Sequence, residues 1–198
     1  TIKGKGYSPA EESPSAYHGV SAHMMDTEET PAAGKKDGIA PLSFSDVFGE
    51  EMCRFAAKDQ KLCAITAAMA VGTGLEPFSE QYHDRFFDVG IAEEHAVTFA
   101  AGLAVKGYLP VFAVYSTFFQ RCYDQLLHDA ALEKTHVVLA IDRAGIVGDD
   151  GDTHQGVFDI PLLTSIPGVQ IYSPASFEGL REDLRRALYE DTGVAVVR

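Results

Sequence analysis

The chain has 198 residues, of which 46% are hydrophobic and 23% charged, a composition typical of a globular protein with a buried core. Its 29 acidic and 16 basic residues give a formal net charge of −13, which argues against a general binder of nucleic acids or anionic membranes without excluding a local basic pocket. No apolar run approaches the roughly 20 residues that a membrane-spanning helix needs.

Residues 1–42 differ in composition from the rest of the chain. Thr1–Tyr7 is compatible with a short strand that runs into a glycine turn, and Ser8–Pro41 is rich in Pro, Ser, Gly, Ala and Glu, which predicts an extended, partly mobile linker. The sequence does not start with Met and stops at Arg198 inside an apolar run. We therefore expect a piece of a longer polypeptide, whose main domain, residues 43–198, is cut near its C-terminal end.

From Ser43 onward the pattern becomes regular. Ser43 is a suitable helix cap, and apolar side chains recur at helical spacing after it, whereas the later apolar runs are short and bounded by turn residues. We expect helices at Phe44–Asp59, Ile91–Lys106, Phe118–Leu132 and Phe177–Tyr189, and strands at Lys61–Ala67, Arg85–Val89, Leu109–Tyr115, His136–Asp142, Val169–Tyr172 and Val194–Arg198. This alternation is typical of an α/β fold with a mostly parallel sheet covered by helices on both faces. Ligands of such sheets bind beyond the carboxyl ends of the strands.

Asp88–His95 places three titratable side chains in the first turn of a predicted helix, directly after a strand. Acidic residues at a helix start also complement the helix dipole, so the spacing alone leaves a purely structural role open. The surrounding helix is very apolar, however, and a carboxyl group in apolar surroundings can share or donate a proton near neutral pH.

Ile141–Gly156 is a long polar loop rich in glycine, with one Arg, several Asp and one His after a predicted buried strand. Its acidic spacing does not fit a calcium loop. Long loops in compact domains are usually functional or disordered, and the Arg and His favour function over a plain surface loop. Tyr115–Arg121 also follows a strand; it is either the packed start of a helix or a pocket wall that offers Arg121 to a phosphate or carboxylate.

The cysteines and histidines show no metal-binding pattern. Cys53, Cys63 and Cys122 lack ligand spacing and indicate reduced, mostly buried thiols in a cytoplasmic protein. The histidines have no zinc spacing, so we assign no metal ligand to this chain.

Together these motifs resemble one known family. The segments that carry the resemblance to the pyrimidine-binding domain of the 1-deoxy-D-xylulose-5-phosphate synthases are FFDVGIAEEHAVTFAAGLAVKGY, YSTFFQRCYDQLLHD and IDRAGIVGDDGDTHQGVFD. TIKGKGYSPAEESPSAYHGV is similar to the end of the preceding, diphosphate-binding domain of the same enzymes. The resemblance divides the chain into the end of that domain at 1–20, a linker at 21–42 and the pyrimidine-binding domain at 43–198.

The resemblance implies an enzyme that uses thiamine diphosphate and Mg²⁺. It would decarboxylate pyruvate and join the two-carbon fragment to glyceraldehyde 3-phosphate, giving 1-deoxy-D-xylulose 5-phosphate and CO₂ for isoprenoid, thiamine and pyridoxal synthesis. It also implies a homodimer, with a cytoplasmic location, or the plastid stroma if the source is a plant or alga, and no nucleic-acid or membrane partner.

Glu93 matches the family's glutamate that hydrogen-bonds the aminopyrimidine ring of the cofactor, where the carboxyl favours the imino tautomer that removes the thiazolium C2 proton. The resemblance further implies catalytic roles for His18 and His154, cofactor contacts for Tyr7, Phe118 and Arg121, and substrate contacts for Tyr115, Arg143, Asp150 and His154. Arg143 suits an anion, either the pyruvate carboxylate or the sugar phosphate.

The chain also departs from the family pattern. Glu94 stands where the family usually has Gln, and we expect it to point away from the ring with little effect. The Tyr-Pro-Arg segment that carries another phosphate-binding arginine, the magnesium and diphosphate site and the C-terminal domain are not part of this sequence, so we expect this chain by itself to be inactive. The alternatives are a transketolase-like or pyruvate dehydrogenase-like subunit, against which the DGDTHQG loop argues, and a non-catalytic pyrimidine-domain protein.

Overall fold

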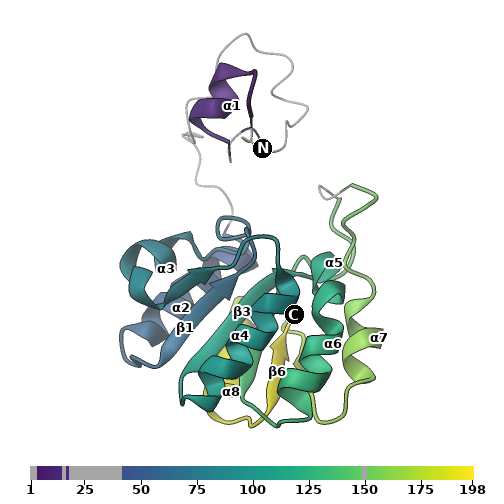
Figure 1. Cartoon of the computed structure of the whole chain (residues 1–198). Coiled ribbons are helices and arrows are strands. Elements are labelled where there is room, and N and C mark those ends of the chain that lie inside the picture. Colours follow the sequence, from purple (N-terminus) through teal and green to yellow (C-terminus); the bar gives the residue numbers. More distant parts are fainter. Residues whose placement is uncertain (1–3, 15–16, 18–41, 149–150) are drawn as a thin grey trace. The chain divides into compact units, whose positions relative to one another are not determined.

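The computed structural model of the chain describes residues 4–14, 17, 42–148 and 151–198. The chain separates into two compact units, residues 1–41 and 42–198, which we describe one at a time (Figure 1).

The described part of the first unit contains one short helix, α1 (Ser8–Glu12). The prediction of an extended linker is wrong for this stretch, because a proline in the first turn suits a helix start and Glu11 accepts a hydrogen bond from the backbone N–H of Gly6 at 2.7 Å. The expected glycine turn is present at residues 4–6. Residues 1–3 of the predicted strand, and the predicted linker from residue 18 to 41, lie outside the described residues.

The second unit is built on a six-stranded sheet in which every pairing is parallel. The spatial order is β2-β1-β3-β4-β6-β5. The strands are β1 (Leu62–Thr66), β2 (Phe86–Asp88), β3 (Leu109–Tyr115), β4 (Val137–Asp142), β5 (Gln170–Tyr172) and β6 (Val194–Val197). All six predicted strands and the α/β fold class are therefore confirmed, with ends that differ by at most one residue from the predictions.

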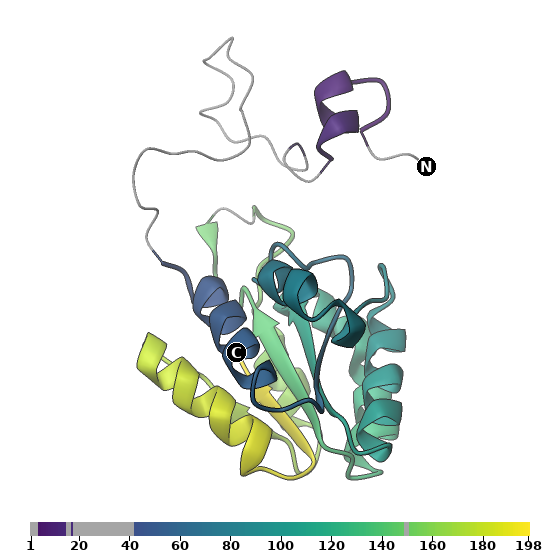
Figure 2. The same ribbon diagram turned by 90° about the vertical axis from the view of Figure 1, so that its left-hand side faces the viewer.

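Helices cover both faces of this sheet (Figure 2). One face carries α2 (Phe44–Ala56), α3 (Glu76–Gln81) and α8 (Phe177–Tyr189), and the other carries α4 (Glu93–Val105), α5 (Ser116–Phe119), the segments that follow it and α7 (Asp159–Thr164). Each face has its own core, centred on Met52, Leu62 and Leu184 on the first and on Val97, Phe112 and Leu139 on the second. Burial on both faces explains why the central strands consist almost entirely of apolar residues.

The predicted helix Phe118–Leu132 is not a single regular α-helix. The chain passes through α5, the 3-10 turn η3 (Gln120–Cys122), α6 (Tyr123–Gln125) and the π-helical segment η4 (Leu126–Ala131). These helix types differ in their period, but each segment spans only three to six residues, which is too short for its own period to be read from the sequence. The helices α3 and α7 were not predicted, because six residues are less than two turns and show no readable period.

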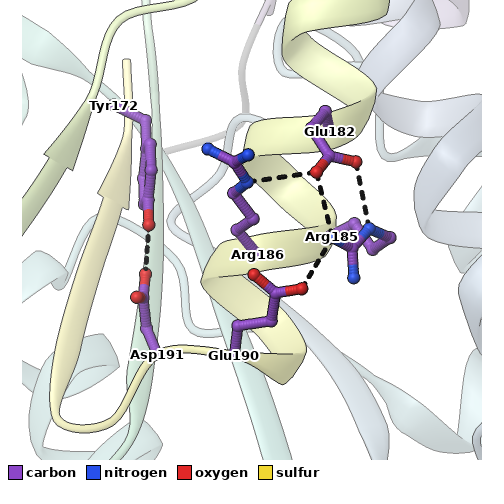
Figure 3. A network of polar contacts seen from close by, with 6 residues as sticks. All are labelled: Tyr172, Glu182, Arg185, Arg186, Glu190 and Asp191. Carbon is purple, nitrogen blue, oxygen red and sulfur yellow. Dashed lines mark hydrogen bonds and ion pairs between the residues drawn. The ribbon is translucent and has the colours of Figure 1, made fainter.

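The exposed side of α8 carries a network of charged groups rather than a binding site (Figure 3). Glu182 accepts hydrogen bonds from Arg185 and Arg186, and these two guanidinium groups lower the pKa of Glu182 to about 2. All three side chains are open to solvent, where ion pairs contribute little to stability. Arg181, also on α8, pairs instead with the buried Glu51 of α2 at 3.1 Å.

The start of α2 provides a test of local stability. Ser43 and Asp46 form a reciprocal capping box, and the hydrogen bonds from Ser43 lower the pKa of the Asp46 carboxyl below its ordinary value of 3.8. We predict that Ser43→Ala lowers the free energy of unfolding by about 1 kcal/mol at pH 7, measured by urea denaturation. Because the pKa of Asp46 is lowered in the folded state, the stabilisation is present above pH 3.8 and is lost as the pH falls through the lowered value.

Ser79→Ala is the matched control, since the Ser79 hydroxyl donates to the carbonyl of Glu76 within α3 and caps no helix start. We expect it to change the free energy of unfolding by less than about 0.5 kcal/mol. Equal losses in the two variants would contradict the assigned cap.

The cysteines provide a second test. Cys63 and Cys122 are buried and Cys53 is partly exposed. Burial raises the pKa of the Cys63 thiol to about 12, against the opposing effect of Arg85, and burial followed by the charge of Glu93 raises that of Cys122. We predict that a disulfide reagent at pH 8 modifies one thiol in the folded chain and three in denaturant. Modification of two or more thiols in the folded chain would show that this packing is wrong.

Candidate active site

Glu93 lies at the carboxyl edge of the sheet, where the chain turns from β2 into α4. Asp88, the last residue of β2, shapes this turn because its Oδ1 accepts hydrogen bonds from the backbone N–H groups of Ala68, at 2.8 Å, and Gly90, at 2.9 Å. α4 then begins at Glu93, whose side chain is only 2% exposed. The helix start offers a favourable electrostatic environment for this buried carboxylate.

Arg121, in the neighbouring turn η3, pairs with this carboxylate. Its Nη1 donates to both carboxylate oxygens of Glu93, at 3.0 and 2.8 Å. The Arg121 side chain is 43% exposed, so the ion pair joins a buried acid to a base at the surface of the site. Burial and the negative charge of Glu93 raise the pKa of the neighbouring Cys122 thiol, which stays protonated.

Two aromatic rings continue the site away from this ion pair. The guanidinium of Arg121 lies 4.8 Å from the centre of the Phe118 ring, and Phe118 stacks on Tyr115 with 6.0 Å between centroids. The guanidinium of Arg143 lies 4.4 Å from the centre of the Tyr115 ring. His154 meets Phe118 edge-on at 5.4 Å. The site is thus a continuous stack in which two cations enclose two aromatic rings.

Tyr115 and Arg143 are positioned by close backbone contacts. Tyr115 ends β3 in register with Asp142, the last residue of β4, and Arg143 follows directly. A Cβ atom on Gly72 would lie 1.7 Å from the Tyr115 hydroxyl oxygen, so only glycine leaves room for this ring. A Cβ on Gly156 would lie 2.3 Å from the carbonyl oxygen of Arg143, which has a left-handed φ of 54°.

Asp142 ties the site to the opposite face of the sheet. Its carboxylate accepts a hydrogen bond from the Ser45 hydroxyl at 2.6 Å and another from the backbone N–H of Arg143 at 2.6 Å. Ser45, Asp142 and Arg143 all line a cavity of about 310 Å³ between α2, α8 and the ends of β3, β4 and β6. This volume is at the small end of the range for small-molecule sites.

The structure brings together most of the residues that the sequence singled out. Six of them share the site just described: Glu93, Tyr115, Phe118, Arg121, Arg143 and His154. Tyr7 lies in the first unit, where its exposed ring meets Tyr17 edge-on at 5.6 Å. His18 and Asp150 lie outside the described residues.

Sequence reasoning missed the residues that support this site. The sequence patterns do not identify Gly72 or Ser45, and they include Asp142 only as part of the Ile141–Gly156 loop. Ser45 and Asp142 are 97 positions apart, and no local pattern connects them. The double glycine of the Val71–Gly74 turn was the one available signal, since glycines in a turn at a strand end indicate close backbone approach.

Two further observations define the described part of the chain. It contains no group of three or more His, Cys, Asp or Glu side chains that could hold a metal ion. None of its helices has the length and apolar character of a membrane-spanning segment.

A parallel sheet with a buried carboxylate and an aromatic stack at its carboxyl edge defines an α/β ligand-binding domain of the doubly covered type. The comparisons with known proteins give the family. The family described as "Transketolase, pyrimidine binding domain" matches residues 40–198, and the chain belongs to this family.

Curated relatives cover the full length of the chain. It is 50% identical over 196 residues to a protein named 1-deoxy-D-xylulose-5-phosphate synthase 1 of Geobacter sulfurreducens, with 99% of the chain covered, and 52% identical over 198 residues to a 1-deoxy-D-xylulose-5-phosphate synthase of Methylococcus capsulatus, with 100% covered. The chain spans about 30% of the length of each. A transketolase structure from Campylobacter jejuni shares the fold, with a TM-score of 0.72 and 23% identity over 79% of this chain and 25% of that one.

The contact between Gly72 and Tyr115 is testable by substitution. We predict that Gly72→Ala lowers the free energy of unfolding by about 1–3 kcal/mol in urea denaturation, because the added methyl group must displace the Tyr115 ring. Tyr115→Phe, which removes the overlapping oxygen, should recover part of this loss. Gly148→Ala is the control, since its Cβ would meet no atom within 4 Å. A neutral Gly72→Ala would place Tyr115 elsewhere.

Proposed function

We propose that this chain is the pyrimidine-binding part of a thiamine-diphosphate-dependent enzyme that converts pyruvate and glyceraldehyde 3-phosphate to 1-deoxy-D-xylulose 5-phosphate and CO₂. The observation that carries the proposal is the buried Glu93 carboxylate beside the Phe118–Tyr115 stack at the carboxyl edge of the sheet. The names of relatives about 50% identical over the whole chain support it. The product would serve isoprenoid, thiamine and pyridoxal synthesis.

The residues of the site fit the pyrimidine end of this cofactor. Glu93 is a buried carboxylate with acceptor positions beyond its ion pair with Arg121, and the Phe118 ring lies next to this pair, a combination that suits a flat heteroaromatic ring. Thiamine diphosphate, when bound, supplies the carbon nucleophile for the reaction. Glu93 would hold a proton at the pyrimidine ring nitrogen, and Tyr7, Phe118 and Arg121 would orient the ring.

The other half of the stack suits the substrates. Arg143 would bind the carboxylate of pyruvate or the phosphate of glyceraldehyde 3-phosphate through its guanidinium, which packs against the Tyr115 ring. His154 packs against Phe118, and its Nδ1 is hydrogen-bonded to the Thr153 hydroxyl at 2.7 Å. These two contacts would orient the imidazole ring for proton transfer. By the resemblance, His18 would take part in catalysis and Asp150 would contact the substrate.

The assembly around this domain is also part of the proposal. Another domain of the complete polypeptide would hold Mg²⁺ and the diphosphate of the cofactor. The complete polypeptide would be cytoplasmic. The enzyme would be a homodimer. Two exposed apolar side chains support this, Ile91 just before α4 and Val105 at its end, which are 77% and 71% exposed.

The direct test is turnover by the complete polypeptide that contains this chain. It is incubated with pyruvate, glyceraldehyde 3-phosphate, thiamine diphosphate and Mg²⁺, and the product is identified by mass. We expect 1-deoxy-D-xylulose 5-phosphate from the unmodified protein and at least a hundredfold less from Glu93→Ala, because the ring nitrogen would lose the carboxyl partner proposed for it.

Glu94→Gln is the matched control, since Glu94 is the exposed neighbour of Glu93 on α4 and should retain turnover within about twofold. Product from both Glu93→Ala and the unmodified protein would remove Glu93 from the proposed role. If neither makes it, the transketolase-like or non-catalytic alternative replaces the proposal.

A further inference from the structure

We propose that Arg121 is a positioning residue that keeps Glu93 ionised and fixes its carboxylate, so that the proton shared between Glu93 and the pyrimidine resides on the ring nitrogen. This inference rests on the proposed function, because it assigns a role to a residue of the same site. It gives Arg121 a task carried out through Glu93, beyond a contact with the ring.

The burial of Glu93 and the exposure of Arg121 support the claim that Arg121 keeps Glu93 ionised. Glu93 is 2% exposed and Arg121 is 43% exposed. A buried carboxylate without a counter-ion becomes protonated rather than bear the cost of desolvation. Within the described residues, both side-chain hydrogen bonds to Glu93 come from Arg121. Arg121 is therefore the group that compensates the charge of Glu93.

The other titratable groups around Glu93 do not replace this compensation. Cys122 is buried and stays a neutral thiol, since burial and the charges of Glu93 and Glu94 raise its pKa. His95, also on α4, is exposed and stacks on Phe99 at 6.0 Å, away from the carboxylate.

The hydrogen-bond geometry supports the claim that Arg121 fixes the Glu93 carboxylate. A carboxylate offers about four lone-pair positions on its two oxygens. One nitrogen, Nη1 of Arg121, lies between the two oxygens of Glu93 at 3.0 and 2.8 Å and uses the inner positions. No other side-chain hydrogen bond reaches Glu93 within the described residues, so we infer that its outer positions can accept from a ring nitrogen while Arg121 stays in place.

Phe118 holds the guanidinium in position. The guanidinium carbon of Arg121, Cζ, lies 4.8 Å from the ring centre of Phe118, which is itself stacked on Tyr115. This contact depends on the planar guanidinium, whereas the charge compensation depends only on a cation. Lysine at position 121 should accordingly retain the charge effect and lose the stacking.

The location of the proton matters for the proposed chemistry. An ionised Glu93 accepts a hydrogen bond from a protonated ring nitrogen, which leaves positive charge on the ring. A protonated Glu93 would instead donate to a neutral ring nitrogen. Only the first arrangement makes the neighbouring amino group of the ring more acidic, and an acidic amino group is what proton removal at the reactive carbon requires.

The first experiment measures the protonation of Glu93 in the cofactor-free complete polypeptide. Infrared spectra at pH 7 report the C=O stretch of a protonated carboxyl group. We expect no such band in the unmodified protein, a band in Arg121→Gln that disappears in Arg121→Gln/Glu93→Gln, and no band in Arg121→Lys. Arg185→Gln, which removes an exposed arginine of α8, is the control and should show no band. Absence of the band in Arg121→Gln overturns the proposal.

The second experiment adds thiamine diphosphate and Mg²⁺ and follows hydrogen–deuterium exchange at the reactive carbon by NMR. We expect the exchange rate to fall at least tenfold in Arg121→Gln and to recover to within about threefold in Arg121→Lys, which a role in packing alone would not produce. An unchanged rate in Arg121→Gln, or a loss in Arg121→Lys as large as in Arg121→Gln, overturns the proposal. An unmodified protein that does not bind the cofactor would contradict the proposed function instead, and the infrared result would still report on the ion pair.

Discussion

Parallel pairing along the centre of the sheet is the constraint on which the site depends. In a parallel sheet all carboxyl ends lie at one edge, and the register pairs Thr66 with Asp88 and Tyr115 with Asp142 at that edge. The turn that leads to Glu93 is therefore adjacent to the end of β1, and Arg143 is adjacent to the end of β3. Backbone hydrogen bonds within the sheet thus place residues far apart in the sequence within reach of one ligand.

The stack from Glu93 to Arg143 makes this arrangement chemically specific. Each cation–ring contact contributes about 0.5–2 kcal/mol, so the aromatic rings help to hold the two guanidinium groups in place. At one end, an ion pair fixes Glu93. At the other end, Tyr115 packs against the backbone of Gly72, which leaves room for its hydroxyl group. A site with both ends fixed is suited to a flat ring at one end and an anion at the other.

The sequence predicts the elements of this domain better than their contacts. The strands and the helices α4 and α8 carry strong apolar patterns and were located to within two residues at each end, except that α2 ends three residues earlier than expected. The short helices α3 and α7 and the irregular turns between Ser116 and Ala131 lack a distinguishing period. Six of the candidate site residues share one site, yet their pairings, such as Arg121 with Glu93, depend on tertiary packing that no local pattern encodes.

A crystal structure of the complete polypeptide with thiamine diphosphate and Mg²⁺ tests the central claim most directly. We predict that a pyrimidine ring nitrogen lies within hydrogen-bond distance of the Glu93 carboxylate, that the ring lies against Phe118, and that Nη1 of Arg121 still contacts Glu93. A cofactor whose pyrimidine ring lies elsewhere, with Glu93 contacting only Arg121, would contradict the assignment of this edge of the sheet as the pyrimidine site.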